Sequence, residues 1–510
     1  MGFFIAKSQF LSYGLNRMTI PKEINLILEK LADNDLPAGR QGFEAYVVGG
    51  CVRDLLLGTV PKDWDITTNA KPEQIRKLFP KNFYENKFGT VTILTSSKNE
   101  TLSNVEITPF RLEGKYSDKR HPDEITFAKK LEDDLSRRDF TINALALDQN
   151  KKIIDYFDGQ KDLKNKIIRT VGKAEDRFNE DALRMLRAVR FACTLSVGSP
   201  AQGWQVEEKT FKAIQKNADL IQMISNERIR DELTKIFETE KAAHGIDLLR
   251  QTGLLKFILP ELDRGVGVSQ NKHHIYDIYE HSMRALDEAS KHKFNLEVKV
   301  AALFHDIGKP ETKQGEGPDS TFYNHDYIGA KFVDRILKRL KFPNKFIDKV
   351  VILVKNHMFI SDPEKLTDAG ARRLIKRVGM ENIVDLINLR VADRLGMGRP
   401  KEKPYRLRTI EYMIEKVSKD PISAKMLKIN GTDIMNLLKI QPSPKVGAIL
   451  DVLLAEVIED PKKNNKKYLE DRAKEFEEEN LEQLRKLAKG KIEDKKEEED
   501  LKIREKYWIK

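Results

Sequence analysis

A short apolar strand that ends in two glycines constrains the fold of this chain more than any other stretch. Residues 45–48 are typical of a buried strand, Gly49 and Gly50 break it, and residues 52–57 begin a helix. Two glycines after a strand let backbone N–H groups approach a phosphate closely, and Arg53 adds a positive charge there. The stretch therefore predicts an α/β domain with a phosphate-binding turn.

Two aspartates separated by one residue, Asp63 and Asp65, follow this turn. On an extended segment, residues i and i+2 face the same way, and two close carboxylates repel each other unless a cation sits between them. Mg²⁺ prefers oxygen ligands and also binds substrate phosphates, so the pair predicts a magnesium site that activates a hydroxyl and neutralises a leaving pyrophosphate. The alternative is a plain turn rich in Asp and Gly; the glycine pair and Arg53 ahead of it favour the metal.

A change in periodicity divides the chain. Its 510 residues are too many for one core and predict three or four domains. Further strands at 90–94, 104–109 and 153–156 extend the α/β pattern, whereas apolar residues recur at helical spacing from 161 onward. We expect an N-terminal extension over 1–19, an α/β domain over 20–160, and four further segments over 161–265, 266–400, 401–460 and 461–510.

Composition narrows the class of protein. The net charge of +11 suggests an anionic partner such as nucleic acid, although a charged soluble surface would give the same balance. Two cysteines, Cys51 and Cys193, offer neither a disulfide framework nor a zinc cluster, which fits a reducing cytoplasm. No apolar run approaches the ~20 residues of a membrane span, so we expect no membrane partner. The oligomeric state stays open at this point.

Several long motifs resemble the polymerase-β superfamily of nucleotidyltransferases and, more narrowly, the bacterial-type CCA-adding enzymes and their poly(A) polymerase relatives. The resemblance covers residues 45–265 and rests on 49–65, 104–111, 137–145 and 226–233. It implies an α+β chain, in which a polymerase-β-like nucleotidyltransferase head with a mixed sheet and helices precedes an all-α neck and body, an HD domain and a helical tail.

The resemblance also implies roles for single residues in the head. Asp63 and Asp65 would hold Mg²⁺, and Glu106 is a candidate third carboxylate, with an ordinary exposed strand glutamate as the alternative. Arg138, within the block 137–145, would contact the nucleotide near the glycine turn. The alternative for that block is a capped basic helix start.

A carboxylate and a guanidinium on a predicted helix over 180–191 offer a way to choose a base without a template. Asp181 accepts hydrogen bonds and Arg184 donates them, which matches the Watson–Crick edges of cytosine and adenine better than those of guanine and uracil. Arg187 and Arg190, one further step each along the helix, are expected to reach phosphates. The resemblance implies that Asp181 and Arg184 select CTP and ATP. The alternative is an ordinary helix salt bridge worth ~0.3–0.5 kcal/mol.

Seven of the nine histidines fall within 266–400. His305 and Asp306 are adjacent on an apolar helix, where burying both is costly unless a metal satisfies them. The segment resembles an HD domain, the phosphohydrolase fold. The resemblance implies a divalent transition metal and attack by metal-activated water on a phosphate ester; the alternative is an idle domain used for tRNA docking. The ligands it implies are His281, His305, Asp306 and Asp393, with His325 and His357 at a second ion.

Together these features predict an Mg²⁺-dependent cytoplasmic enzyme that adds C, C and A to the 3′ end of tRNA from CTP and ATP and releases pyrophosphate. One alternative is a restricted relative that adds only A, only CC or poly(A). Another is an HD metal phosphohydrolase whose head merely binds RNA, or an idle RNA-binding module. The Lys/Glu-rich residues 461–510 are expected to form a solvated helix or a disordered tail.

Overall fold

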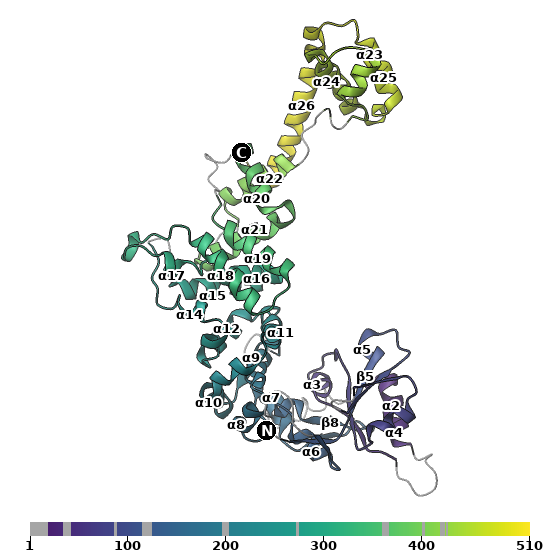
Figure 1. The fold of residues 1–510 in the computed structure, drawn as a ribbon, viewed down its shortest axis with the longest axis vertical. Coiled ribbons are helices and arrows are strands. Elements are labelled where there is room, and N and C mark those ends of the chain that lie inside the picture. Colours follow the sequence, from purple (N-terminus) through teal and green to yellow (C-terminus); the bar gives the residue numbers. More distant parts are fainter. Residues whose placement is uncertain are drawn as a thin grey trace, which may run out of the picture. The chain divides into compact units, whose positions relative to one another are not determined.

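The chain forms two compact units, Met1–Val354 and Lys355–Lys510 (Figure 1). The computed structural model describes residues 19–33, 42–85, 89–114, 125–195, 203–271, 275–359, 367–399, 403–418, 424 and 427–509. The boundary between the units falls inside helix α19 (Asn344–Asn356), within the segment in which the sequence places the clustered histidines.

A seven-stranded mixed sheet forms the N-terminal head. Its order is β3-β4-β5-β2-β1-β8-β9, and only β2 and β5 run parallel. The strands are β1 (Ala45–Val48), β2 (Asp65–Thr68), β3 (Asn82–Glu85), β4 (Thr90–Leu94), β5 (Asn104–Pro109), β8 (Leu145–Leu147) and β9 (Ile153–Asp155). The predicted α+β head with a mixed sheet is confirmed.

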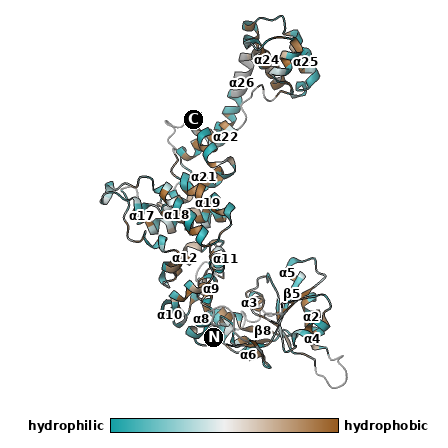
Figure 2. Ribbon diagram, in the orientation of Figure 1, coloured by the Kyte–Doolittle hydropathy of each residue, from teal (hydrophilic) through white to brown (hydrophobic). Residues whose placement is uncertain are grey.

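Amphipathic helices cover this sheet. Helix α2 (Lys22–Ala32) buries Ile24, Ile27, Leu28 and Leu31, the i, i+3, i+4, i+7 stripe of a core-facing helix. It packs against β1 and α4 (Pro72–Leu78), and α3 (Gly50–Leu56) also packs against β1 (Figure 1). Many helices carry hydrophobic residues on one side and hydrophilic residues on the other, as Figure 2 shows.

The neck that follows the head is helical, as predicted, with one addition. Strands β10 (Ile167–Ile168) and β11 (Gln205–Val206) pair in parallel between its helices. Strands of two residues have no alternation to detect, so the sequence gives no sign of them. The neck helices are α7 (Gly159–Asn165), α8 (Ala174–Glu180), α9 (Leu183–Thr194), α10 (Glu208–Asn217), α11 (Asn226–Phe237) and α12 (Ala242–Gln251).

Further helices complete the first unit. Helix α16 packs against α15 and α11, so the histidine-bearing helices continue the core of the neck. The helices of this part of the first unit are α13 (Leu255–Ile258), α14 (Pro260–Asp263), α15 (Ile278–Lys291), α16 (Leu296–Phe304), α17 (Lys309–Thr312) and α18 (His325–Arg339).

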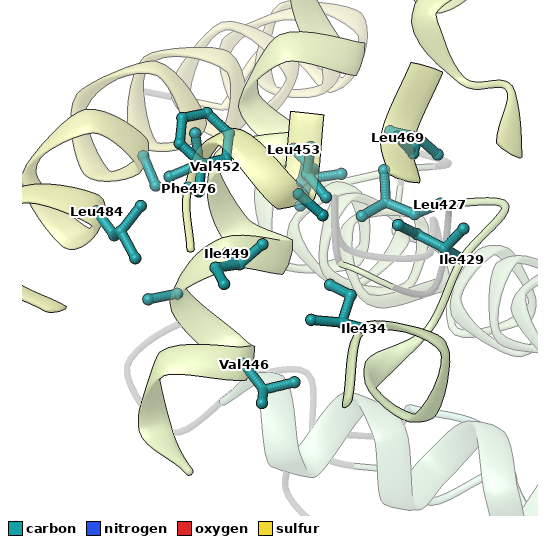
Figure 3. Close-up of a cluster of buried hydrophobic side chains, with 14 of the residues drawn as sticks. Leu427, Ile429, Ile434, Val446, Ile449, Val452, Leu453, Leu469, Phe476 and Leu484 are labelled. Carbon is teal, nitrogen blue, oxygen red and sulfur yellow. The ribbon is translucent and has the colours of Figure 1, made fainter. Parts of the chain in front are cut away.

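Two groups of helices make up the second unit. One group packs around a hydrophobic cluster that includes Ile449, Leu453, Leu469 and Leu484 (Figure 3). The helices of the unit are α20 (Asp368–Val378), α21 (Ile383–Gly396), α22 (Tyr405–Ser418), α23 (Gly431–Leu438), α24 (Pro444–Glu459), α25 (Lys466–Glu475) and α26 (Leu481–Tyr507).

The charged C-terminal segment is helical and more tightly packed than a solvated tail. Leu484 of α26 is fully buried beside α24, and Ile503 near its other end is 5% exposed. There the Tyr412 hydroxyl donates to Asp500 (2.5 Å) and Lys506 pairs with Glu415 (2.6 Å). Helix α26 therefore joins the apolar cluster to α22.

Across the described ranges, every helix is too short or too polar to cross a membrane.

Candidate active site

Gly49 shapes the turn between β1 and α3. Its backbone has φ +83° and ψ −135°, a conformation that residues other than glycine rarely adopt. A Cβ on Gly49 would lie 2.7 Å from Arg138 Nη1 and 3.8 Å from Asp65 Oδ2. The absence of a side chain thus lets a cation and a carboxylate from distant segments meet over the turn.

Three carboxylates gather at the edge of this turn. Asp65 is the first residue of β2, and its partner in the parallel strand β5 is Glu106. Asp63 lies in the bend just before β2. Burial raises the pKa of Asp65 to about 6; Arg138 opposes this shift, and the carboxylates of Asp63 and Glu106 add to it. An acidic cluster of this kind suits a divalent cation with oxygen ligands.

Arg53 lies under the turn and has protein partners of its own. It donates to Asn143 Oδ1 (2.7 Å) and to Asp54 (2.9 Å), and its guanidinium lies 5.2 Å from the ring centroid of Phe191. These contacts hold Arg53 at the junction between the head and the neck.

The predicted helix over 180–191 is interrupted, and this expectation is corrected. Helix α8 ends at Glu180 and α9 begins at Leu183, while Asp181 has extended backbone angles (φ −137°, ψ 106°). The Asp181 side chain accepts from the backbone N–H of Leu183 (3.0 Å), a local bond that competes with helix formation. Asp181 therefore lies at a kink between α8 and α9.

Asp181 and Arg184 pair with other residues rather than with each other. Arg228 of α11 donates to both Asp181 oxygens (2.7 and 3.3 Å). Arg184 donates to Glu180 (2.6 Å) and to the backbone carbonyl of Arg137 (3.1 Å). The simple i, i+3 salt bridge is thus absent between these two described side chains, and each is oriented separately. Sequence reasoning missed Glu180 and Arg228 as partners, although Arg228 lies in the neck motif 226–233.

Arg187 and Arg190 are also paired. Arg187 contacts Asp139 (2.6 Å), and Arg190 contacts the buried Glu232 (2.5 Å). Burial acts to raise the pKa of Asp139, but the guanidinium of Arg187 and a hydrogen bond from Asn143 outweigh it and hold that pKa below its usual value. Arg187 therefore ties α9 to Asp139, and Arg190 ties α9 to Glu232 of α11.

A second cluster in the first unit joins three helices. His281 lies on α15, His305 and Asp306 follow α16, and His325 begins α18. His281 Nε2 lies 3.1 Å from His305 Nε2, and Asp306 oxygens lie 3.3–3.5 Å from the three Nε2 atoms. A metal with bonds of about 2.1 Å holds neighbouring ligand atoms about 3.0–3.4 Å apart, so the spacing of His281, His305 and Asp306 suits one ion. His325 instead approaches the other oxygen of Asp306.

His305 and His325 each carry a proton on Nδ1, because that nitrogen faces a backbone carbonyl. The Nδ1–H of His305 donates to the Ala302 carbonyl (2.8 Å), and that of His325 donates to the Phe322 carbonyl (2.7 Å). In the neutral ring each Nε2 then directs a lone pair toward Asp306, the orientation that metal-binding histidines adopt. Lys309, buried and 2.7 Å from Asp306, supplies the positive charge beside these acceptors.

His357 and Asp393, the other two predicted ligands of the HD site, belong to the second unit. Both are buried, and Asp393 on α21 accepts from Arg390 (2.6 Å). The cluster in the first unit thus contains four of the six residues that the sequence singled out.

Family models match most of the chain. A poly A polymerase head domain matches residues 45–169, a probable RNA and SrmB-binding site of polymerase A matches 203–265, and a tRNA nucleotidyltransferase domain 2 matches 326–473.

Relatives and solved structures extend this similarity to nearly the whole length. A CCA-adding enzyme of Lactococcus lactis is 35% identical over 86% of this chain and 93% of the relative, and one of Ligilactobacillus salivarius is 34% identical over 89% and 96%. The crystal structure of the Bacillus stearothermophilus CCA-adding enzyme in complex with CTP is 28% identical, with a TM-score of 0.54, over 90% of this chain and 98% of that one.

Gly49→Ala tests the glycine turn, with Gly58→Ala as its matched control. Both glycines have positive φ (+83° and +73°), but a Cβ at Gly58 meets nothing within 4 Å. We expect Gly49→Ala to displace Arg138 and weaken binding of tripolyphosphate by about tenfold or more, as loss of a charged hydrogen bond does. Isothermal titration calorimetry measures this affinity. Equal affinities in the two variants would show that Arg138 does not bind phosphate at this turn.

Proposed function

This chain belongs to the family of CCA-adding enzymes, and we propose that it completes the 3′ end of tRNA with C, C and A from CTP and ATP, releasing pyrophosphate without a nucleic-acid template. The observation that carries this proposal is identity of 34–35% over at least 86% of the chain to two curated members. The three carboxylates beside the glycine turn supply the chemistry that the reaction needs.

In this proposal Asp63 and Asp65, with Glu106 beside them, hold Mg²⁺. Their mutual repulsion and the burial of Asp65 make the site favourable for a divalent cation. Bound there, Mg²⁺ supplies activation of the 3′-hydroxyl and neutralises charge on the triphosphate. Arg138 lies over the glycine turn and binds the triphosphate, while the backbone at Gly49 and Gly50 leaves room for it.

Asp181 and Arg184 choose the base. An ionised carboxylate only accepts hydrogen bonds and a guanidinium only donates them. Cytosine and adenine each present an amine beside a ring nitrogen acceptor, which the two side chains complement, whereas guanine and uracil present the reverse. Arg228 and Glu180 orient this pair from either side, which supports selection by a preformed site.

The helical body recognises tRNA by its backbone and shape, which requires no sequence reading. The net charge of +11 favours such contacts. We also propose the cytoplasm as the compartment, because Cys51 and Cys193 are both free and buried, as in proteins of reducing compartments.

Primer extension on a tRNA that lacks its CCA end tests the function. We expect addition of C, C and A followed by a stop; addition of A alone, CC alone or a long A tail would select a restricted relative instead. Asp65→Asn should lower the rate of addition by roughly 10³-fold or more, because charge neutralisation is lost, while the tRNA dissociation constant stays unchanged. Asp33→Asn, at an exposed position of the head, is the control. Full turnover by Asp65→Asn would refute the metal assignment.

A second variant tests base selection. Asp181→Asn replaces a pure acceptor with a group that also donates, so we expect the preference for CTP and ATP over GTP and UTP to fall by roughly 10- to 100-fold, as for other buried polar contacts. Incorporation of each of the four nucleotides into the same tRNA measures this preference. Asp176→Asn, exposed on α8, controls for the loss of charge. An unchanged preference would argue against the protein template.

The convergent Nε2 atoms of His281, His305 and His325 around Asp306 favour a second activity. We propose that the cluster binds a divalent transition metal. Bound there, the metal supplies a nucleophile from water for hydrolysis of a phosphate ester, such as a cyclic phosphate on a damaged tRNA end. His357 and Asp393, the two further ligands that the sequence predicts, lie in the second unit and stay predictions.

His305→Gln tests this second site without touching the head. We expect the variant to lose one equivalent of bound Mn²⁺, measured by mass spectrometry of the dialysed protein, and to lose hydrolysis of 2′,3′-cyclic CMP, while nucleotide addition persists. His244→Gln, exposed and outside the cluster, is the control. Retention of metal by His305→Gln would remove the basis for a hydrolase, and loss of nucleotide addition would assign the cluster a structural role.

A further inference from the structure

Asp134 is a buried carboxylate that the proposed chemistry does not use. It lies on the short helix α6 (Leu131–Ser136), three and four residues before Arg137 and Arg138, and its exposed fraction is 0%. Burying an ionised carboxylate is costly unless it is paired and hydrogen-bonded. Its partners therefore indicate why the charge is there.

The two oxygens of Asp134 serve different neighbours. Oδ1 accepts from Nε and Nη2 of Arg137 (3.0 and 2.8 Å). Oδ2 accepts from the hydroxyl of Thr67 (3.2 Å) and lies 3.5 Å from Arg138 Nη2. Burial acts to raise the pKa of Asp134, but Arg137 and Arg138 outweigh it and leave that pKa below its usual value, so the group is an anion at neutral pH.

Oδ2 thus lies between the catalytic strand and the nucleotide-binding arginine. Thr67 is two residues after Asp65 on β2, on the same face of the strand. Arg138 extends from Asp134 toward the glycine turn, where its Nη1 occupies the space that a Cβ of Gly49 would fill.

The guanidinium of Arg138 has few other restraints. Its Nε is buried and has no hydrogen-bond partner among the described residues. The ion pair with Asp134, the charge of Asp65 and the open space over Gly49 are then the features that place it. Its Nη1 lies over Gly49 near Asp65, where the triphosphate binds in the proposed reaction.

We propose that Asp134 is a positioning residue for nucleotide addition: it holds Arg138 over the glycine turn beside Asp65, so that the triphosphate-binding cation is in place before nucleotide or metal arrives. This inference rests on the proposed function of the head. It assigns Asp134 an effect on nucleotide affinity that acts through Arg138 and leaves tRNA affinity alone.

A double-mutant cycle tests this role. Asp134→Asn retains the size of the side chain and removes its charge. We expect it to raise the dissociation constant for CTP, measured in EDTA, by about tenfold, and to raise the KM for CTP more than it lowers kcat. In the Arg138→Gln background, Asp134→Asn should add nothing further. An equal, additive loss in that background would overturn the proposal.

Arg137→Gln is the matched control, because it removes the other ion pair of the same carboxylate. We expect it to lower the unfolding temperature and to leave CTP affinity unchanged; a CTP defect equal to that of Asp134→Asn would mean that the carboxylate acts only through stability. If Asp134→Asn does not fold, Thr67→Val replaces it, since it keeps the charge of Asp134 and removes the hydroxyl that contacts Oδ2 (3.2 Å) and the Thr108 carbonyl (3.1 Å). Thr67→Val should then weaken CTP binding in the protein that carries Arg138 and have no further effect in the Arg138→Gln background. An unchanged CTP affinity in the presence of Arg138 would overturn the proposal.

The same measurements separate this inference from the function beneath it. A wild-type protein that neither binds CTP nor extends tRNA would refute the proposed function. A wild-type protein that does both, beside an Asp134→Asn variant with wild-type CTP affinity, would refute the positioning role alone.

Discussion

The ion pair between Asp139 and Arg187 is the interaction on which the site depends. Asp139 is nearly buried at the junction of the head and the neck, and it accepts from Asn143 (2.9 Å) and from Arg187 (2.8 Å). Asn143 in turn accepts from Arg53 beneath the glycine turn (2.7 Å). A buried carboxylate without these partners would cost several kcal/mol. The pair therefore ties helix α9, which follows the kink at Asp181, to the glycine turn between β1 and α3.

Sequence reasoning located the features whose physical cause is local. A strand followed by two glycines allows a backbone with positive φ, and Gly49 adopts one. The charge of Asp63, two residues before Asp65, acts on the Asp65 carboxyl group, and the register of β2 with β5 places Glu106 opposite Asp65. The helices of the body were equally predictable, because apolar residues at helical spacing mark the buried face of each helix. The mixed sheet and the helical body were therefore predictable.

Contacts between distant segments were not predictable in the same way. Asp181 meets Arg228 across 47 residues, and no spacing in the chain indicates that pair. The kink at Asp181 was hidden because apolar residues keep helical spacing on both sides of it, while a single side-chain hydrogen bond to Leu183 breaks the helix. The packing of the C-terminal segment was also not predicted, because its many charged residues obscure a sparse apolar stripe that includes Leu484 and Ile503.

The two anchor points of α26 restrict how the length of that helix can change during evolution. Leu484 packs near one end and Asp500 contacts Tyr412 near the other, and both must keep their facing. An α-helix turns by about 100° per residue, so one inserted residue would rotate the second anchor away from its partner. Insertions of about seven residues, close to two full turns, restore the facing but lengthen the helix by about 10 Å. Viable lengths of α26 are therefore spaced in steps of whole turns.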